Sequence, residues 1–409
     1  MIRRRDTGGH GRPVAQVRLN HPTSLPVYPK VDHYRRHPME GPTMVLMSGG
    51  SGARGLAQTL IQYTHNSTHV LPMFDDGGSS RVLREHFKMP PPGDLRNRLM
   101  ALSDMSQRGN PEVGRLFRTR LKESGTPQQL QAELDTYLSE SHPRMELIEP
   151  RYRRIIIKHL QRFNEHKLPS FDLRNGNIGN FVIAGAYLTL GDLESVIFEF
   201  SALAAVRGEV LPVCSGANYH LKAEFQNGSE MIGQSQITST PHPPIKRLAI
   251  VERDQAGEWC EVRPALNPLV SRAVEDAQLI ACTMGSFYTS LLPILLVDGM
   301  GAAVRRSSRP KVLVANLVRD EETMSMTVSK MVSEVCRALR TSDDQPGRVS
   351  DYLHYVLVNE HGSSDADGHV PVDVDRVRDV GVEPIALPLE RAPGVHDPEL
   401  VAAALLSLC

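Results

Sequence analysis

Two adjacent carboxylates followed by glycines and serines are the residues of this sequence best suited to chemistry. The motif consists of Asp75, Asp76, Gly77, Gly78, Ser79 and Ser80. Carboxylate and hydroxyl oxygens suit a hard cation such as Mg2+, and glycine lets backbone N–H groups approach a phosphate. We expect Asp75 and Asp76 to ligate the metal or contact a reacting hydroxyl, and the following residues to contact phosphate. The structural alternative is a pair of aspartates that caps a helix.

A glycine-rich turn precedes this motif and is a second candidate for phosphate binding. It contains Gly49, Gly50, Ser51 and Gly52, followed by Gly55 in a G-x-G-x-x-G pattern. Such turns bring backbone N–H groups and a helix N-terminus towards phosphate. No lysine–serine or lysine–threonine pair follows the turn, which excludes a Walker A loop. A tight turn without a ligand is the structural alternative.

The same spacing also fits a nicotinamide-dependent oxidoreductase. In that class an acid about 20 residues after the glycines holds a ribose hydroxyl, and Asp75 and Asp76 stand near that position. The glycines and serines that follow these aspartates favour metal and phosphate contacts instead. The oxidoreductase alternative stays open, and stabilisation by NAD(P) would identify it.

A proline run introduces a third motif, which continues as Gly93, Asp94, Leu95, Arg96 and Asn97. The prolines are expected to place Asp94, Arg96 and Asn97 at the start of a helix. There the helix dipole and the Arg96 guanidinium would favour a phosphate. Asp94 would cap the helix or reach a bound metal, and we include it among the candidate catalytic residues. Taken alone, the motif is also compatible with an ordinary capped helix.

Hydrophobic patterns predict the elements that position these motifs. Apolar runs at Thr43–Met47 and His69–Phe74 predict buried strands around a helix, which is the start of a parallel sheet. Asn227-Gly228 predicts a hairpin. The remaining expected strands are Leu279–Thr283, Lys311–Leu317 and Tyr355–Val358, and the main expected helices are Ile178–Leu190, Leu193–Ala205, Thr327–Leu339 and Pro398–Leu408. We therefore predict a doubly wound α/β domain from residue 41 to 409, with a helical insertion at about 111–172.

Composition limits the partners of the chain. Its 409 residues carry a net charge of −1, but residues 1–40 alone carry about +5 and are expected to form a mostly disordered basic extension. The remaining acidic body argues against a nucleic-acid partner. The apolar run Leu291–Val297 is too short to span a membrane. Five scattered cysteines and the lack of a signal-peptide pattern favour a cytoplasmic protein.

In order and spacing, the motifs resemble the family of 2-phospho-L-lactate transferase (CofD) and the YvcK-type gluconeogenesis factor. The residues that carry the resemblance are Ser48–Gly55, Asp75–Ser80, Pro91–Asn97, Gly179–Phe181, Ala205–Pro212, Asn267–Pro268, Gly285–Pro293, Asn316–Leu317 and Tyr355–Asn359. The resemblance covers nearly all of the chain after residue 43, except the 111–172 segment. The aspartate–glycine–serine and proline–glycine–aspartate forms are nearer to the YvcK-type branch.

The resemblance implies a Rossmann-like nucleotide-binding fold and a homodimer. In the transferases, a Mg2+-dependent reaction moves a phospholactyl group from a guanosine diphosphate conjugate to a deazaflavin. In the YvcK-type proteins, the implied ligand is a nucleotide sugar such as UDP-N-acetylglucosamine, without an assigned reaction. The expected ligand is thus a nucleotide diphosphate or nucleotide sugar, with Mg2+ as cofactor. A phospho-group transferase and a non-catalytic regulator of central metabolism or cell envelope both remain open.

The resemblance also implies further site residues, and a specific role for Arg96 of the third motif. Arg96 and Arg207 are candidates to neutralise phosphate charge, although Arg207 is equally compatible with a structural role at a helix C-terminus. Tyr288 is expected to pack against a nucleobase or in the core. The further residues expected to contact the ligand are Asn180, Gly285, Ser286 and Ser290.

The sequence departs from the family pattern at three places. Thr283 and Met284 replace a glycine–proline pair, Arg81 replaces a glycine after the serine pair, and the 111–172 segment is longer than expected. These departures suggest a divergent branch, such as the CofD-like proteins of bacterial gene clusters called GAK systems.

Overall fold

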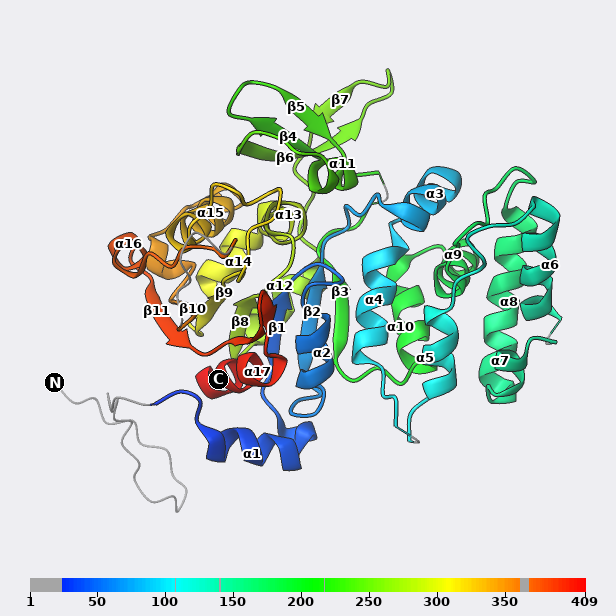
Figure 1. The fold of residues 1–409 in the computed structure, drawn as a ribbon, viewed down its shortest axis with the longest axis horizontal. Helices are drawn as coiled ribbons and strands as arrows, with labels where there is room; N and C mark the ends of the chain where they lie inside the picture. The colour runs from blue at the N-terminus through cyan, green and yellow to red at the C-terminus, as the bar shows by residue number, and fades with distance from the viewer. Residues whose placement is uncertain (1–23, 107, 140, 217, 361–367) are drawn as a thin grey trace, which may run out of the picture.

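A seven-stranded parallel sheet forms the centre of the molecule (Figure 1). The computed structural model describes residues 24–106, 108–139, 141–216, 218–360 and 368–409. The strands, in their order across the sheet, are β3 (Glu209–Pro212), β2 (Ser67–Leu71), β1 (Met44–Met47), β8 (Leu279–Cys282), β9 (Lys311–Val314), β10 (Tyr355–Asn359) and β11 (Glu383–Leu387). All neighbours pair in parallel, which confirms the predicted α/β, Rossmann-like class.

The strand order reverses between β1 and β8. Met44 pairs with Ser67 of β2 on one side and with Leu279 of β8 on the other. From β1 the chain builds the sheet outward through β2 and β3, whereas β8 to β11 extend it in the opposite direction. In open α/β sheets, ligands bind outside the carboxyl ends of the strands at such a reversal. The glycine-rich turn follows β1 and the Gly285 loop follows β8, so both lie at this point.

Helices cover both faces of the sheet, which explains why its central strands are continuous apolar runs. Leu46 of β1 packs in one cluster and Val45 in the other, because successive side chains of a strand point to opposite faces. The first face is covered by α1 (Tyr28–Arg36), α2 (Arg54–Leu60) and α17 (Pro398–Leu408). The second face is covered by α12 (Pro268–Asp276), α13 (Leu292–Leu296), α14 (Met300–Arg306), α15 (Val328–Thr341) and α16 (Val374–Val380).

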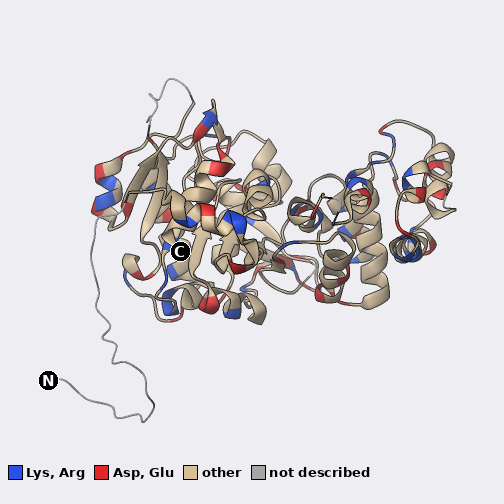
Figure 2. Ribbon diagram, turned by 90° about the horizontal axis from the view of Figure 1, so that it is seen from below, with Lys and Arg blue, Asp and Glu red and all other residues tan. Residues whose placement is uncertain are grey.

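A helical lobe lies beside the β3 edge of the sheet, as Figures 1 and 2 both show. It consists of α3 (Gly78–Phe87), α4 (Pro92–Leu102), α5 (Pro111–Arg118), α6 (Pro127–Leu138), α7 (Pro143–Glu146), α8 (Pro150–His166), α9 (Ile178–Leu190) and α10 (Leu193–Leu203). The predicted insertion supplies α5 to α8. These helices share one apolar core with α4, α9 and α10, and the Phe163 ring stacks on Phe181 at 4.3 Å between centroids. The insertion is therefore an integral part of the lobe.

A small antiparallel sheet stands over the carboxyl ends of the parallel strands (Figure 1). Its order is β5 (Glu230–Ile232), β4 (His220–Phe225), β6 (Ile245–Arg253) and β7 (Trp259–Glu261), with α11 (Gln234–Ser239) between β5 and β6. The Asn227-Gly228 hairpin is confirmed, since Gly228 has a φ of +83° and joins β4 to β5. The strands β6 and β7 are absent from the sequence prediction. A two-stranded hairpin, β12 (Glu390–Ala392) and β13 (Val395–His396), completes the fold.

The basic N-terminal segment contains more structure than predicted. Residues 1–23 lie outside the described part, but Tyr28–Arg36 form α1 and Pro38–Glu40 a 3-10 turn. Val31 is buried against the α17 side of the sheet, and the Val27 N–H donates to Ser407 Oγ at 2.8 Å. Val31 and the half-buried Tyr34 are three residues apart and form one apolar face of α1. This face is hard to recognise in the sequence because charged residues surround it.

No helix in the described ranges is long and apolar enough to cross a membrane.

Candidate functional site

The glycine-rich turn after β1 packs against two other loops. A side chain at Gly50 would place its Cβ 2.2 Å from Asp94 Oδ1, and the Gly50 backbone N–H donates to the Asp94 carboxylate. A Cβ at Gly52 would lie 2.5 Å from the Cα of Gly285. Gly49 likewise lies directly against Ser290 Oγ. Glycine is required here because three loops approach one another more closely than side chains allow.

Arg98 holds the glycine-rich turn in place, although it was not among the predicted site residues. This residue of α4 is completely buried. Its guanidinium donates to Gly49 O at 2.6 Å and to Ser48 Oγ at 2.8 Å, and it lies 3.1 Å from His69 Nδ1. Buried guanidinium groups are costly without partners, so these contacts give Arg98 a structural role.

Asp75 and Asp94 approach each other behind these loops. A Cβ at Gly93 would lie 2.3 Å from Asp75 Oδ2, and the Gly77 N–H donates to Asp75 Oδ1 at 3.0 Å. Burial raises the pKa of Asp75. Burial, followed by the charge of Asp75, raises the pKa of Asp94 to about 7. Two carboxyl groups in one small volume are the arrangement in which each resists ionisation of the other.

A pocket of about 650 Å3 opens next to Asp75, and we call it the arginine cleft. It lies between the N-termini of α3 and α4, the start of α9 and the loop before α9. Its polar lining comprises Asp75, Gly77, Gly78, Ser79, Ser80, Arg96, Asn97, Arg120, Asp172, Arg174, Asn175 and Asn180. The structure thus brings the predicted residues Gly77–Ser80, Arg96, Asn97 and Asn180 together in the lining of one pocket.

Arg96 is held in place across this cleft. Its Nε donates to Asn180 Oδ1 at 3.0 Å, and Asn180 Nδ2 donates to Ser79 Oγ at 3.0 Å. Asn180 itself is fixed by its backbone N–H, which donates to Asn177 Oδ1, the cap of α9. These bonds connect α4, α9 and α3 and leave the two terminal nitrogens of Arg96 for a ligand.

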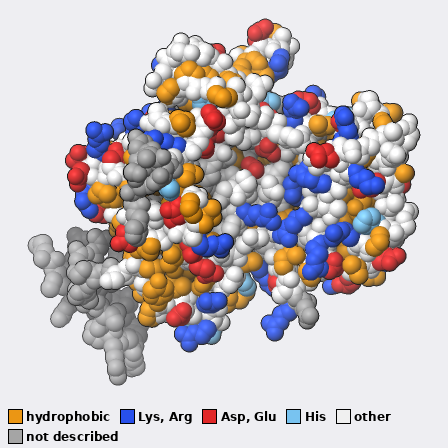
Figure 3. Space-filling model, in the orientation of Figure 1, with side chains coloured by type: hydrophobic (Ala, Val, Ile, Leu, Met, Phe, Trp, Pro, Cys, Tyr) orange, Lys and Arg blue, Asp and Glu red, His pale blue; other side chains and the backbone are white. Residues whose placement is uncertain are grey.

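Three further arginines surround Arg96. Burial, and then the charges of Arg120, Arg54 and Arg118, lowers the pKa of Arg96 to about 10. None of these four arginines forms an ion pair within the described residues. Figure 3 shows Lys and Arg side chains gathered where the helical lobe meets the body. Uncompensated cations above helix N-termini are suited to binding an anion.

Arg54, Arg118 and Arg120 were missed in the sequence. Arg54 lies inside the glycine-rich pattern, which is a usable signal, whereas Arg118 and Arg120 lie at the end of α5 in the insertion. Arg120 Nη1 donates to Asn175 O at 2.8 Å, which places it on the cleft wall.

Asp76 points away from the arginine cleft. Its Oδ2 and Oδ1 accept from the Gln234 and Ser235 N–H groups, at 3.0 and 2.7 Å, so Asp76 caps α11 of the small sheet. Although burial opposes ionisation, hydrogen bonds from His220 and Ser235 lower the pKa of Asp76. Asp75 lines the arginine cleft, whereas Asp76 lines a different pocket. Of the two aspartates, Asp76 is therefore the one that caps a helix.

Arg207 and Tyr288 lie away from the cleft, in the structural positions that the sequence left open as alternatives to ligand contact. Arg207 precedes β3 and therefore lies at the amino end of the parallel strands, opposite the glycine-rich loops, where it pairs with Asp104 at 3.0 Å. The Tyr288 side chain is buried in the core, and its hydroxyl contacts Met326 Sδ. Both residues are structural because the topology turns them away from the site.

Hydrogen bonds with Asn316 and Glu322 hold the loop after β8 in place. Asn316 Nδ2 donates to Gly285 O at 2.8 Å, and the Tyr288 and Thr289 N–H groups donate to the buried Glu322 carboxylate. Ser286 precedes the π-helical turn Phe287–Leu291 and stays partly exposed, and Ser290 is buried beside Gly49. Of the predicted residues in this loop, Ser286 keeps access to a ligand.

The oxygen ligands of the site fit a cation that is held together with a phosphate. Within the part of the chain that the structure describes, no group of three or more His, Cys, Asp or Glu side chains is arranged to hold a metal. Asp75 and Asp94 supply two neighbouring carboxylates, and Mg2+ is commonly bound through one or two carboxylates plus substrate phosphates.

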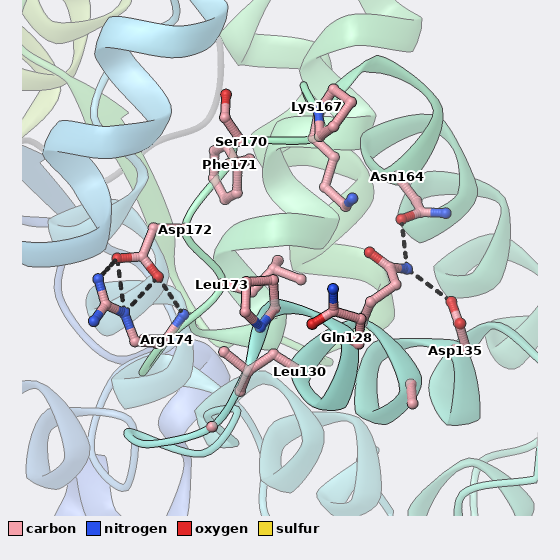
Figure 4. Close-up of a pocket in the computed structure, with 15 residues that line it drawn as sticks. Gln128, Leu130, Asp135, Asn164, Lys167, Ser170, Phe171, Asp172, Leu173 and Arg174 are labelled. Carbon is pink, nitrogen blue, oxygen red and sulfur yellow. Dashed lines mark hydrogen bonds and ion pairs between the residues drawn. The ribbon is translucent and has the colours of Figure 1, made fainter.

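A larger pocket of about 950 Å3 adjoins the arginine cleft, and we call it the amide pocket (Figure 4). The two share Phe171, Asp172 and Arg174 as lining residues. Gln131 Nε2 donates to Asp135 Oδ1 at 2.8 Å and to Asn164 Oδ1 at 3.1 Å. Gln128 and Lys167 point into the pocket over Leu130 and Leu173.

Comparisons with known proteins agree with the fold and with the family that the motifs resemble. The sequence model of the family described as 2-phospho-L-lactate transferase CofD matches residues 44–389. Proteins named gluconeogenesis factor from Halalkalibacterium halodurans and Bacillus subtilis are each 29% identical over 292 residues, which is 71% of this chain and 72% and 73% of theirs. Matches to relatives from Nostoc sp. and Clostridium acetobutylicum cover 72% and 78% of this chain, at 28% identity. They extend over only 52% and 56% of those proteins, so the chain spans about half their length.

A crystal structure of a UPF0052 family member from Bacillus halodurans has a similar fold. Its TM-score is 0.68 at 25% sequence identity, and the match covers 90% of this chain and 99% of that one.

Proposed function

Because the chain belongs to the 2-phospho-L-lactate transferase CofD family, we propose that it binds a nucleoside diphosphate compound with the phosphates in the arginine cleft. The observation that carries this proposal is that Arg96 and Arg120 line the cleft without ion-pair partners in the described ranges. The charges of Arg54 and Arg118 also act on Arg96. Phosphate oxygens accept bidentate hydrogen bonds from guanidinium groups. The Ser79 and Ser80 hydroxyls and the N-terminus of α3 add donors on the opposite wall.

The amide pocket supports a ligand that extends beyond its phosphates. The lining of the arginine cleft has one more cation than carboxylates, since Arg96, Arg120 and Arg174 stand against Asp75 and Asp172. In the amide pocket Lys167 and Arg174 are balanced by Asp135 and Asp172. The side-chain amides of Gln128, Gln131 and Asn164 are suited to hydroxyl and amide groups, since each offers both a donor and an acceptor. A nucleotide sugar combines an anionic centre with such neutral polar groups.

Thermal stabilisation tests this proposal directly. UDP, GDP, UDP-N-acetylglucosamine and NAD(P) would each be added with and without Mg2+, and the unfolding midpoint measured as a function of concentration. A ligand that binds only the folded protein raises the midpoint in proportion to ln(1 + [L]/Kd). We expect a nucleoside diphosphate to stabilise the wild type and to lose at least tenfold in affinity in Arg96→Gln.

Arg207→Gln is the matched control for this experiment. Arg207 belongs to the same residue type but lies at the opposite end of the strands, paired with Asp104. We expect its loss to leave nucleotide affinity unchanged. Equal effects of Arg96→Gln and Arg207→Gln, or stabilisation by NAD(P) alone, would overturn the proposal.

Transfer of a phospho-group is a second candidate function, favoured by the position of Asp75 in the cleft wall. In such a reaction the oxygen of an acceptor hydroxyl bonds to phosphorus and the bridging P–O bond breaks. A nucleoside monophosphate leaves, and the hydroxyl proton passes to solvent. Asp75 and Asp94 are the residues that would hold Mg2+, which neutralises phosphate charge when bound. The chain's own part is to align the phosphates through Arg96 and the Ser79–Ser80 hydroxyls.

Binding without turnover is the alternative form of the same proposal. The relatives from Halalkalibacterium halodurans and Bacillus subtilis are named as gluconeogenesis factors, which is compatible with a regulator of central metabolism. Release of nucleoside monophosphate during incubation with a nucleotide conjugate and an acceptor distinguishes the two. The homodimer and the cytoplasmic location stay predictions, and sedimentation of the purified chain would test the former.

A further inference from the structure

A separate pocket of about 400 Å3 lies between α3 and the small antiparallel sheet, and we call it the Trp259 pocket. It is lined on the helix side by Arg81, Arg84 and Lys88, and on the sheet side by His220, Arg253 and Trp259. It shares no lining residue with the arginine cleft. The N-terminal turn of α3 stands between the two, because Ser79 and Ser80 face the cleft and Arg81 faces the Trp259 pocket.

Positive charge dominates the Trp259 pocket. Four cationic side chains line it, against the carboxylates of Asp76 and Glu85. Asp76 is already engaged, since both its oxygens accept hydrogen bonds from the N-terminus of α11. Arg81, Lys88 and Arg253 make no ion pair with any described residue. Cations that line one pocket from two sides create a positive potential that attracts an anion.

Arg253 and Arg84 are already oriented for such a role. The Arg253 guanidinium lies 4.5 Å from the centre of the Trp259 ring, and its Nη1 donates to Gly257 O at 2.9 Å. Stacking and the hydrogen bond limit the rotamers of this long side chain, which lowers the entropy cost of binding. Arg84 is buried and donates to Asp75 O and Tyr219 O, so it contributes a fixed positive charge to the pocket wall.

The size of the pocket limits the anion. Small-molecule sites usually enclose about 300–1,000 Å3, and this pocket lies at the lower end of that range. Guanidinium groups on the sheet and helix sides fit the oxygens of a phosphate monoester, while the Asn218 amide adds hydrogen-bonding groups for the remainder of the molecule.

We propose that the Trp259 pocket binds a small phosphorylated metabolite, independently of the nucleotide in the arginine cleft. The anion would bridge α3 and the small sheet through Arg81, Lys88 and Arg253. This site does not depend on the proposed function, because the two pockets have different linings.

Trp259 is the only tryptophan of the chain, so tryptophan fluorescence, excited at a wavelength that tyrosine does not absorb, reports on this pocket. The full-length protein would be titrated with glucose 6-phosphate, with inorganic phosphate and with glucose, at constant ionic strength. We expect a saturable fluorescence change with the two phosphates and none with glucose. In Lys88→Gln and Arg81→Gln the half-saturating phosphate concentration should rise at least fivefold.

Lys246→Gln is the matched control, because Lys246 lies on the same small sheet, exposed and paired with Glu224 at 2.6 Å. Its half-saturating concentration should equal that of the wild type. Calorimetric titration of Arg253→Gln gives a second measurement that does not depend on the altered tryptophan environment, and it should show weaker phosphate binding. An unchanged wild-type fluorescence, equal changes in Lys88→Gln and Lys246→Gln, or a signal abolished by saturating UDP would each overturn the proposal.

Discussion

Arg96 Nε lies 3.0 Å from Asn180 Oδ1, although the two residues are 84 positions apart in the chain. The bond joins the third glycine-containing motif to the first turn of α9, and Asn180 continues it to Ser79 of α3. The orientation of the arginine that defines the cleft thus depends on a neutral side chain from another helix. A residue that orients a charged side chain in this way affects ligand binding although it carries no charge itself.

Asn180→Ala should weaken nucleotide binding while preserving the net charge of the cleft. Removal of the amide leaves Arg96 Nε unpaired and frees its side chain, and hydrogen bonds to charged groups contribute about 1.5–3 kcal/mol. We expect about a tenfold loss in affinity by calorimetry. Asn110→Ala is a suitable control, because the Asn110 side chain donates one hydrogen bond to a described residue, Leu203 O, away from the cleft. Equal affinities in the two variants would contradict the positioning role of Asn180.

Gly50→Ala should destabilise the fold, whereas Gly77→Ala should not. A Cβ at Gly50 would stand 2.2 Å from Asp94 Oδ1 and 2.8 Å from its Cα, which forces the two loops apart. Overpacking of this kind costs about 1–3 kcal/mol. At Gly77 the nearest atom would be Asp75 Oδ1 at 3.4 Å, and φ is −87°. Urea unfolding measures the stability of both variants. Equal unfolding midpoints for Gly50→Ala and Gly77→Ala would refute the close contact at Gly50.

Asp76→Ala should act mainly on the stability of the small sheet. Asp76 accepts the first N–H groups of α11, and loss of a helix cap costs about 1 kcal/mol. Hydrogen exchange should show faster opening in Gln234–Ser239, with nucleotide affinity within about twofold of the wild type. A variant with unaltered exchange but no turnover would restore the metal-ligand role expected from the sequence.

Stability should fall at acid pH through Asp343. Burial opposes its ionisation, but hydrogen bonds from Arg305 and Tyr352 lower its pKa to about 2. A carboxyl whose pKa is lower in the folded than in the unfolded state stabilises the protein above its ordinary pKa, near 3.8, and this stabilisation is lost as the pH falls towards 2. Asp343→Asn should therefore cost about 2 kcal/mol at pH 6. Its difference from the wild type, measured by urea unfolding, should shrink at pH 3.

The sequence predicts elements well where a pattern is local. The helix expected at Ile178–Leu190 has those bounds in the structure, and the Asn227-Gly228 hairpin forms as expected. The glycine and aspartate motifs do converge, because loops that follow adjacent parallel strands must meet at one edge of the sheet. The strands β3, β6, β7 and β11 were missed. In β6 buried and exposed residues do not alternate, and β7 has only three residues, so neither has a clear strand pattern.

Side-chain direction is the part of the site that the sequence could not supply. Asp75 and Asp76 are neighbours in the sequence, but the side chains of successive residues in an extended segment point to opposite sides. The Asp76 side chain therefore accepts a hydrogen bond from the N-terminus of α11, whereas Asp75 lines the cleft. The resemblance assigned Arg207 to the site, but Arg207 lies at the amino end of β3, away from the glycine-rich loops. Arg120 lines the cleft only because the insertion packs against α4 and α9, and this tertiary contact has no local signature in the sequence.

The bond from Val27 N–H to Ser407 Oγ makes α1 and α17 a single unit on one face of the sheet. Residues near the two ends of the described chain are therefore neighbours, and a short linker between them would make a circular permutant feasible. New ends could open at the exposed Asn227-Gly228 turn, where a Cβ would meet no atom within 4 Å. Such a permutant should retain the arginine cleft intact, since neither the old junction nor the new one touches its walls.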